Sequence, residues 1–93
     1  MNSKNIFSVV KENDVFVLYF TTEFIDSIGC IWAFVPQETK KLTTGKLFAN
    51  IESSRKLVPL KSPVSGTIVS WNSKFLEYPD KIVSSEFLLR VVQ

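Results

Sequence analysis

Residues 47–60, which read LFANIESSRKLVPL, decide the fold of this chain. A β-prone run ends at Glu52, a polar tip of two serines and two cations follows at residues 53–56, and residues 57–60 are again apolar. A second turn follows at Pro63 and Gly66. The pattern predicts a strand, a tight turn with Ser53-Ser54-Arg55-Lys56 at an exposed tip, and a second strand.

The remaining chain alternates between short β-prone runs and turn signals. Residues 6–10 and 15–20 flank a turn at 11–14 and predict a hairpin. Thr21 or Thr22 can cap a short helix over residues 23–28, and Gly29 supplies a left-handed stop. Further strands are expected at 30–35, 67–71 and 87–92. Ile68 and Val69 are both apolar, which indicates either a bulge or a strand buried on both faces near Gly66. The prediction is a single domain over residues 1–93, mostly β, a flattened barrel-sandwich of two antiparallel sheets with one short helix.

Composition limits the classes of function. The chain has 93 residues, is 45% hydrophobic and carries a net charge of +2, which gives little reason to expect a nucleic-acid partner. Cys30 is the single cysteine and histidine is absent, so neither an intramolecular disulfide nor a structural zinc site is expected. The longest apolar run, residues 15–20, is too short to cross a bilayer, and the polar start lacks a signal-peptide core. The expected location is the cytoplasm.

The residue types also argue against an enzyme. Without histidine no Ser-His-Asp arrangement can form, and nothing activates the thiol of Cys30, which is interpreted as a small strand residue. The acidic pair Glu77 and Asp80 lies beside Tyr78-Pro79 in an expected turn, where solvent-facing carboxylates are a better interpretation than a general acid and base. The large aromatic residues are assigned to the core rather than to a base-stacking surface: Trp32, Phe34, Trp71 and Phe87.

The two turns resemble those of the glycine cleavage system H protein, a small lipoyl-carrying domain. Residues 52–55 read Glu-Ser-Ser-Arg where that family has Glu-Ser-Val-Lys, and residues 62–66 read Ser-Pro-Val-Ser-Gly where it has Ala-Pro-Val-Ser-Gly, at the same separation. Residues 22–24, Thr-Glu-Phe, match the family's Thr-Asp-Tyr. The family's His-Glu-Trp motif and carboxy-terminal helix are absent, and the loop after Val83 is shortened. The resemblance covers about residues 6–92 and implies a lipoyl-domain fold.

The resemblance places the family's lipoylated lysine on Arg55. Amide formation with lipoate requires a neutral amine, whereas a guanidinium stays protonated and its nitrogen lone pairs are delocalised. Lys56 is the alternative attachment point, but adjacent side chains on a hairpin point in different directions. No cofactor is therefore expected unless Lys56 is modified, in which case it is lipoate.

Two hypotheses about function, from different classes, follow from these observations, and a third is weaker. The favoured one is a non-catalytic interaction module whose tip, Glu52 and residues 53–56, contacts a protein partner, in the glycine cleavage system or among other lipoate-linked enzymes. Arg55 or Lys56 could also form an exposed ion pair with Glu52. The alternative is an active lipoyl or aminomethyl carrier modified at Lys56. The weaker alternative is a small β-barrel that binds a ligand or nucleic acid.

Overall fold

The computed structural model describes residues 6–93, which form eight strands and two short α-helices. Each of the expected strands is present within a few residues of its predicted limits, and a further two-residue strand forms around Leu42. The elements in chain order are β1 Phe7–Glu12, β2 Val15–Phe20, α1 Thr22–Ile28, β3 Ile31–Pro36, β4 Lys41–Leu42, β5 Leu47–Ser53, β6 Leu57–Lys61, β7 Gly66–Trp71, α2 Ser73–Glu77, a 3-10 turn Pro79–Lys81 and β8 Leu89–Val92.

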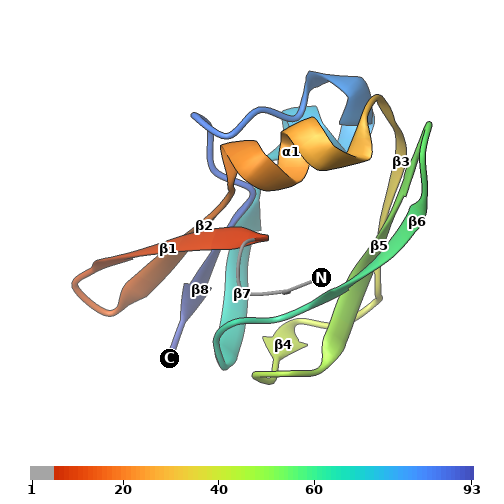
Figure 1. Cartoon of the computed structure of the whole chain (residues 1–93). Helices are drawn as coiled ribbons and strands as arrows, with labels where there is room; N and C mark the ends of the chain where they lie inside the picture. Colours follow the sequence, from red (N-terminus) through yellow and green to blue (C-terminus); the bar gives the residue numbers. More distant parts are fainter. Residues whose placement is uncertain (1–5) are drawn as a thin grey trace.

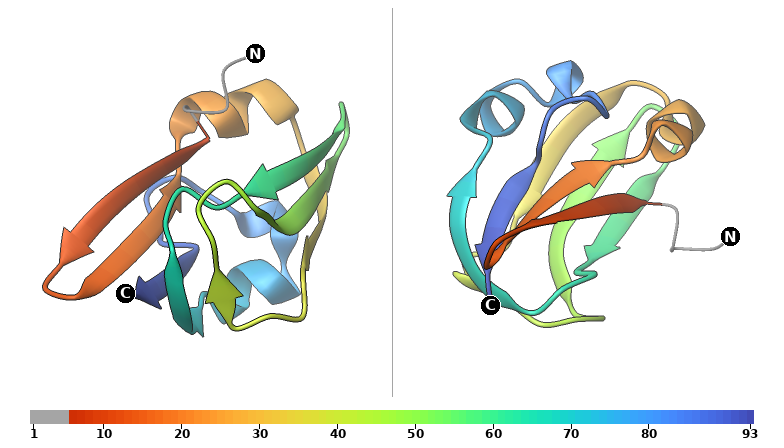
Figure 2. Two further views of the ribbon diagram at one scale, coloured as in Figure 1. Left: turned by 90° about the horizontal axis from the view of Figure 1, so that it is seen from below. Right: turned by 90° about the vertical axis from the view of Figure 1, so that its left-hand side faces the viewer.

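The strands form two antiparallel sheets, which confirms the predicted fold class. One sheet has the order β1-β2-β8-β7-β4 and the other has the order β3-β5-β6. The two sheets face each other across the core, and α1 and α2 both lie at one end of them, on opposite sides (Figures 1 and 2). The β1–β2 hairpin forms one edge of the five-stranded sheet and extends away from the rest of the molecule (Figure 2). The β5–β6 tip lies at the same end as α1 (Figure 1).

The core between the sheets is rich in phenylalanine. Phe20 stacks on Phe7 and Phe24 with ring centroids 5.3 and 5.5 Å apart, and Phe48 lies 5.8 Å from Phe7. Aromatic rings bury large apolar areas, which a domain of this size needs because it has little volume per unit of surface. The side chains with almost no exposed surface are Leu18, Phe20, Ile28, Phe48, Ile51, Leu60, Phe75, Leu88, Leu89 and Val91.

Helix α1 begins and ends where the sequence predicts. The Thr21 side chain accepts a hydrogen bond from the Phe24 amide at 3.1 Å, as an N-cap residue does, and Phe24 and Ile28 are buried. Gly29 ends the helix with φ +75° and ψ −150°, a backbone conformation that is almost confined to glycine. Of the two alternatives for β7, the structure has the bulge, between Ile68 and Ser70.

A second helix, α2, was not predicted. Asn72 caps it by accepting a hydrogen bond from the Lys74 amide, and Phe75 is fully buried. Glu77 and Asp80 therefore lie on α2 and on the following 3-10 turn rather than in an irregular loop, and both are exposed. Five residues with one buried side chain give too short a periodic pattern to distinguish a helix from a turn.

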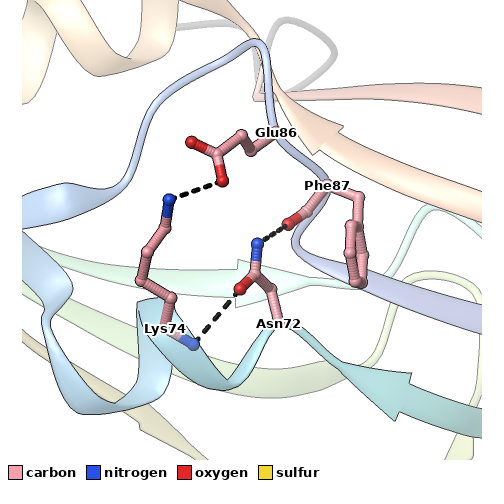
Figure 3. A network of polar contacts seen from close by, with 4 residues as sticks. All are labelled: Asn72, Lys74, Glu86 and Phe87. Atoms are coloured by element: carbon pink, nitrogen blue, oxygen red, sulfur yellow. Dashed lines mark hydrogen bonds and ion pairs between the residues drawn. The ribbon is translucent and has the colours of Figure 1, made fainter.

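A polar network holds the segment before β8 against the start of α2 (Figure 3). The Asn72 side-chain amide donates to the Phe87 carbonyl at 2.9 Å, while its oxygen caps α2. Lys74 and Glu86 form an ion pair at 2.6 Å, but both side chains are close to half exposed, so it adds little stability. Asn72 thus fixes where the shortened loop ends and β8 begins.

One core assignment was wrong. Trp32 is 62% exposed, because a bulge in β3 between Ile31 and Ala33 directs it to the outside of the three-stranded sheet. Phe34 is buried as expected, and Trp71 packs on it and on Phe48 while remaining partly exposed. Phe87 is half-buried and stacks beneath the guanidinium of Arg90 at 3.9 Å.

Candidate functional site

The site is the turn between β5 and β6, where Ser54 and Arg55 are the two central residues. Glu52 pairs with Leu57, and the Ser53 amide donates to the Lys56 carbonyl at 2.9 Å, so the hairpin closes around these two residues. Asn13 is the only residue other than glycine with positive φ in residues 6–93, so Ser54 and Arg55 do not form the primed turn that tight hairpins favour. Side-chain bonds stabilise the turn instead.

Ser53 supplies those bonds from inside the turn. Its hydroxyl donates to the Lys56 carbonyl at 3.0 Å and accepts from the amides of Arg55 at 3.3 Å and Lys56 at 3.1 Å. The side chain is only 5% exposed, so it cannot contact a partner directly, contrary to its predicted place on the surface of the tip. Ser53 holds the turn in position, as serine hydroxyls do in turns of this kind.

Ser54 attaches the tip to the segment after α1. Its amide donates to the Cys30 carbonyl at 2.8 Å, and its hydroxyl accepts from the Cys30 amide at 3.1 Å. A Cβ on Gly29 would lie 2.5 Å from this hydroxyl, so the close approach requires glycine there. The tip is exposed but does not stand free of the domain.

Arg55 lies back over the end of α1 rather than pointing away from the domain. Its Nη1 donates to the Ser27 carbonyl at 3.4 Å, and its Cγ and Nε lie 3.4 Å from the position that a Cβ on Gly29 would take. The last turn of α1 contains no basic residue of its own. A guanidinium beside the carbonyls of a helix end interacts favourably with the helix dipole.

Lys56 and Glu52 are the charged residues of the tip without side-chain partners in residues 6–93. Both are exposed, and neither takes part in a side-chain hydrogen bond or an ion pair there. The ion pair that Glu52 could have formed with Arg55 or Lys56 is therefore absent. Leu57 follows directly, pairs with Glu52 across the hairpin and is 67% exposed.

Cys30 is exposed and its backbone is bonded to Ser54, so it lies next to the tip. The sequence did not predict this proximity, because Cys30 and Ser54 are 24 residues apart and no local pattern marks a contact over that distance. The Arg55 contact with Ser27 was missed for the same reason.

Within residues 6–93 no group of three side chains is arranged to hold a metal ion. That same part of the chain also contains no helix with the length and hydropathy to cross a membrane.

The family profile and the curated relatives that match this chain point to the same family. The profile of the family described as glycine cleavage H-protein matches residues 2–88. A glycine cleavage system H protein from Synechococcus is 27% identical over 77 residues, covering 82% of this chain and 60% of that protein. A glycine cleavage system H-like protein from Staphylococcus aureus is 30% identical over 82 residues, covering 88% of this chain and 74% of that protein.

Solved structures agree on the fold. The crystal structure of a glycine cleavage system H protein from Mycobacterium marinum superimposes with a TM-score of 0.74 at 18% identity, covering 89% of this chain and 69% of that one. The chain spans about 60% of the length of the first curated relatives that it matches.

Proposed function

Because this chain belongs to the glycine cleavage H-protein family, we propose that it is an H-protein-like domain without a lipoyl arm, which uses its tip to contact a protein partner. The observation that supports this proposal most directly is the residue at the second central position of the turn. That residue is Arg55, and its guanidinium interacts with the end of α1.

The chemistry of the tip does not fit attachment of lipoate at Arg55. Acylation needs a nitrogen lone pair, and the guanidinium has none available because it is delocalised and remains protonated. Its side chain also lies along Gly29 and donates to the Ser27 carbonyl, so it is directed toward the domain. The residue that the family resemblance aligns with the lipoyl lysine then has a structural role in this chain.

A second candidate function is a carrier modified at Lys56. It is favoured by one observation, that the exposed Lys56 side chain has no hydrogen bond or ion pair within residues 6–93. Against it stands the position of Lys56 one step beyond the two central residues, where its amide and carbonyl are fixed by Ser53. We therefore keep the interaction module as the main proposal.

The charges at the tip indicate the kind of partner. Arg55 and Lys56 place two cations at the exposed end of the hairpin, where Ser54 adds a hydroxyl. Opposite charge on a partner accelerates association and fixes orientation, so an acidic protein surface fits best. Enzymes of the glycine cleavage system and other lipoate-linked enzymes are the first candidates, because family membership makes them the natural partners to test.

The test replaces both cations. The variant Arg55→Ala/Lys56→Ala should keep its free energy of unfolding within about 1 kcal/mol of wild type, since it loses only the exposed contact of Arg55 with the end of α1. Immobilised wild-type protein is first used to recover partners from host extract, and these partners are identified and purified. The double variant should bind them more weakly than wild type does, and its binding should lose most of its salt dependence.

The matched control removes two exposed lysines at the other end of the molecule, Lys40→Ala/Lys41→Ala, with the same change in net charge. This control should bind as wild type does. If the tip variant binds as tightly as wild type at low salt, the tip is not the contact surface and the proposal fails.

A further inference from the structure

The outer surface of the three-stranded sheet is apolar and uncovered in the part of the chain that the structure describes. Cross-strand partners share a face of a sheet, so Ala33, Glu52 and Leu57 form one row and Val35, Asn50 and Pro59 form the next. Leu47 and Lys61 form the row farthest from the tip, and Trp32 projects beside the first row. We define the outer face by its exposed members: Trp32, Val35, Leu47, Glu52, Leu57, Pro59 and Lys61.

The exposure of these side chains is high for apolar residues. Trp32, Val35 and Leu57 are 62%, 58% and 67% exposed; Leu57 pairs with Glu52 on one side, and Trp32 and Val35 lie on β3 on the other side. Clustered exposed apolar groups mark interaction surfaces, and tryptophan is enriched among the residues that dominate binding energy. A contact surface of this composition needs an occupant that is apolar in the middle and charged at its edges.

We propose that the outer face binds a second copy of this chain in a two-fold symmetric dimer. The two charges on the face complement each other: Glu52 lies toward the tip, Lys61 lies toward the opposite end, and neither has an ion-pair partner in residues 6–93. A two-fold interface uses the same patch on both subunits, so each charge must meet its complement in the other copy. This inference goes beyond the proposed function and does not rest on it.

The position of Glu52 selects the symmetry axis. Glu52 is on β5, the middle strand, so an axis parallel to the strands would place it against Glu52 of the second copy. An axis that lies in the interface perpendicular to the strands exchanges the two ends of the sheet instead. Glu52 then faces the end of the second copy that carries Lys61, and the row of Val35, Asn50 and Pro59 lies near the axis. Residues 53–56 of the tip extend past this contact.

The dimer should be weak, because the face is small. Three strands about 4.8 Å apart and roughly five residues long at about 3.4 Å each give a footprint of roughly 250 Å². Stable interfaces bury about 800 Å² of accessible surface on each partner. We expect a dissociation constant of about 0.1–1 mM, so the protein is monomeric at low concentration and dimeric when concentrated.

The test is sedimentation equilibrium of the full chain from about 20 μM to about 2 mM, a range that brackets the expected constant. Glu52→Lys and Lys61→Glu should each weaken dimerisation by at least about tenfold, because each places like charges opposite one another. The exchanged variant Glu52→Lys/Lys61→Glu should return to within about threefold of wild type, since the pair is restored with its signs reversed.

The matched controls reverse exposed charges on α2 and the 3-10 turn, Glu77→Lys and Lys81→Glu, and should not change the dissociation constant. Val35→Lys is an independent variant that should abolish association by placing a charge near the axis. Circular dichroism verifies that every variant is folded. A wild type that stays monomeric at about 2 mM, the top of the tested range, would overturn the proposal and indicate that the outer face binds a different protein. An exchanged variant that dimerises as weakly as the single variants would also overturn it.

Discussion

At the scale of one residue, Gly29 explains how the tip is joined to the domain. Its φ of +75° ends α1, and the missing Cβ leaves room for the Ser54 hydroxyl and the Arg55 side chain. Gly29→Ala should lower the free energy of unfolding by about 2–3 kcal/mol, since it adds a clash to a strained backbone conformation.

Gly45→Ala is the control for this prediction, because Gly45 has φ +82° but nothing within 4 Å of the position that a Cβ would take. Urea denaturation should show a smaller loss there, about 1 kcal/mol, from backbone strain alone. Equal losses at both positions would contradict the close contact between Gly29 and the tip.

At the scale of one element, the β5–β6 hairpin depends on Ser53. Removing its hydroxyl leaves the amides of Arg55 and Lys56 without their partner inside the turn. Ser53→Ala should therefore cost about 1–3 kcal/mol in the free energy of unfolding. Ser85→Ala removes an exposed hydroxyl without a hydrogen bond in residues 6–93 and should stay within about 0.5 kcal/mol. Similar values for the two variants in urea titrations would show that Ser53 does not stabilise the turn.

The hairpins and α1 could be predicted because their signals are local. Asn13 adopts φ +58° in the β1–β2 turn, Thr21 caps α1, and Gly29 ends it, all within a few residues of the element concerned. Helix α2 could not be predicted, because its five residues are held by the burial of Phe75 and by the Asn72 contact with Phe87. Both contacts depend on how distant segments meet.

At the scale of the whole molecule, the sequence predicted two sheets and one tip but not which surfaces they expose. Trp32 lies outside because of a bulge, and Ser53 lies inside because the turn closes around it, although polarity alone suggests the reverse. Ser54 bonds to Cys30, which is 24 positions away in the sequence, and Arg55 bonds to Ser27, which is 28 positions away. Tertiary packing therefore decides which side chains of the tip are exposed and which are held against the domain.

We propose that this member of the H-protein family carries no lipoyl group, and intact mass spectrometry of the protein purified from its own host is the decisive measurement. The mass should equal that of the unmodified chain, and incubation with a lipoate ligase, ATP and lipoate should leave it unchanged, because Arg55 cannot be acylated. Arg55→Lys, treated in the same way, should accept the group, since Glu52 and Ser53 already flank the position. A lipoyl adduct on the wild type that disappears in Lys56→Ala would overturn this proposal and establish the chain as a carrier.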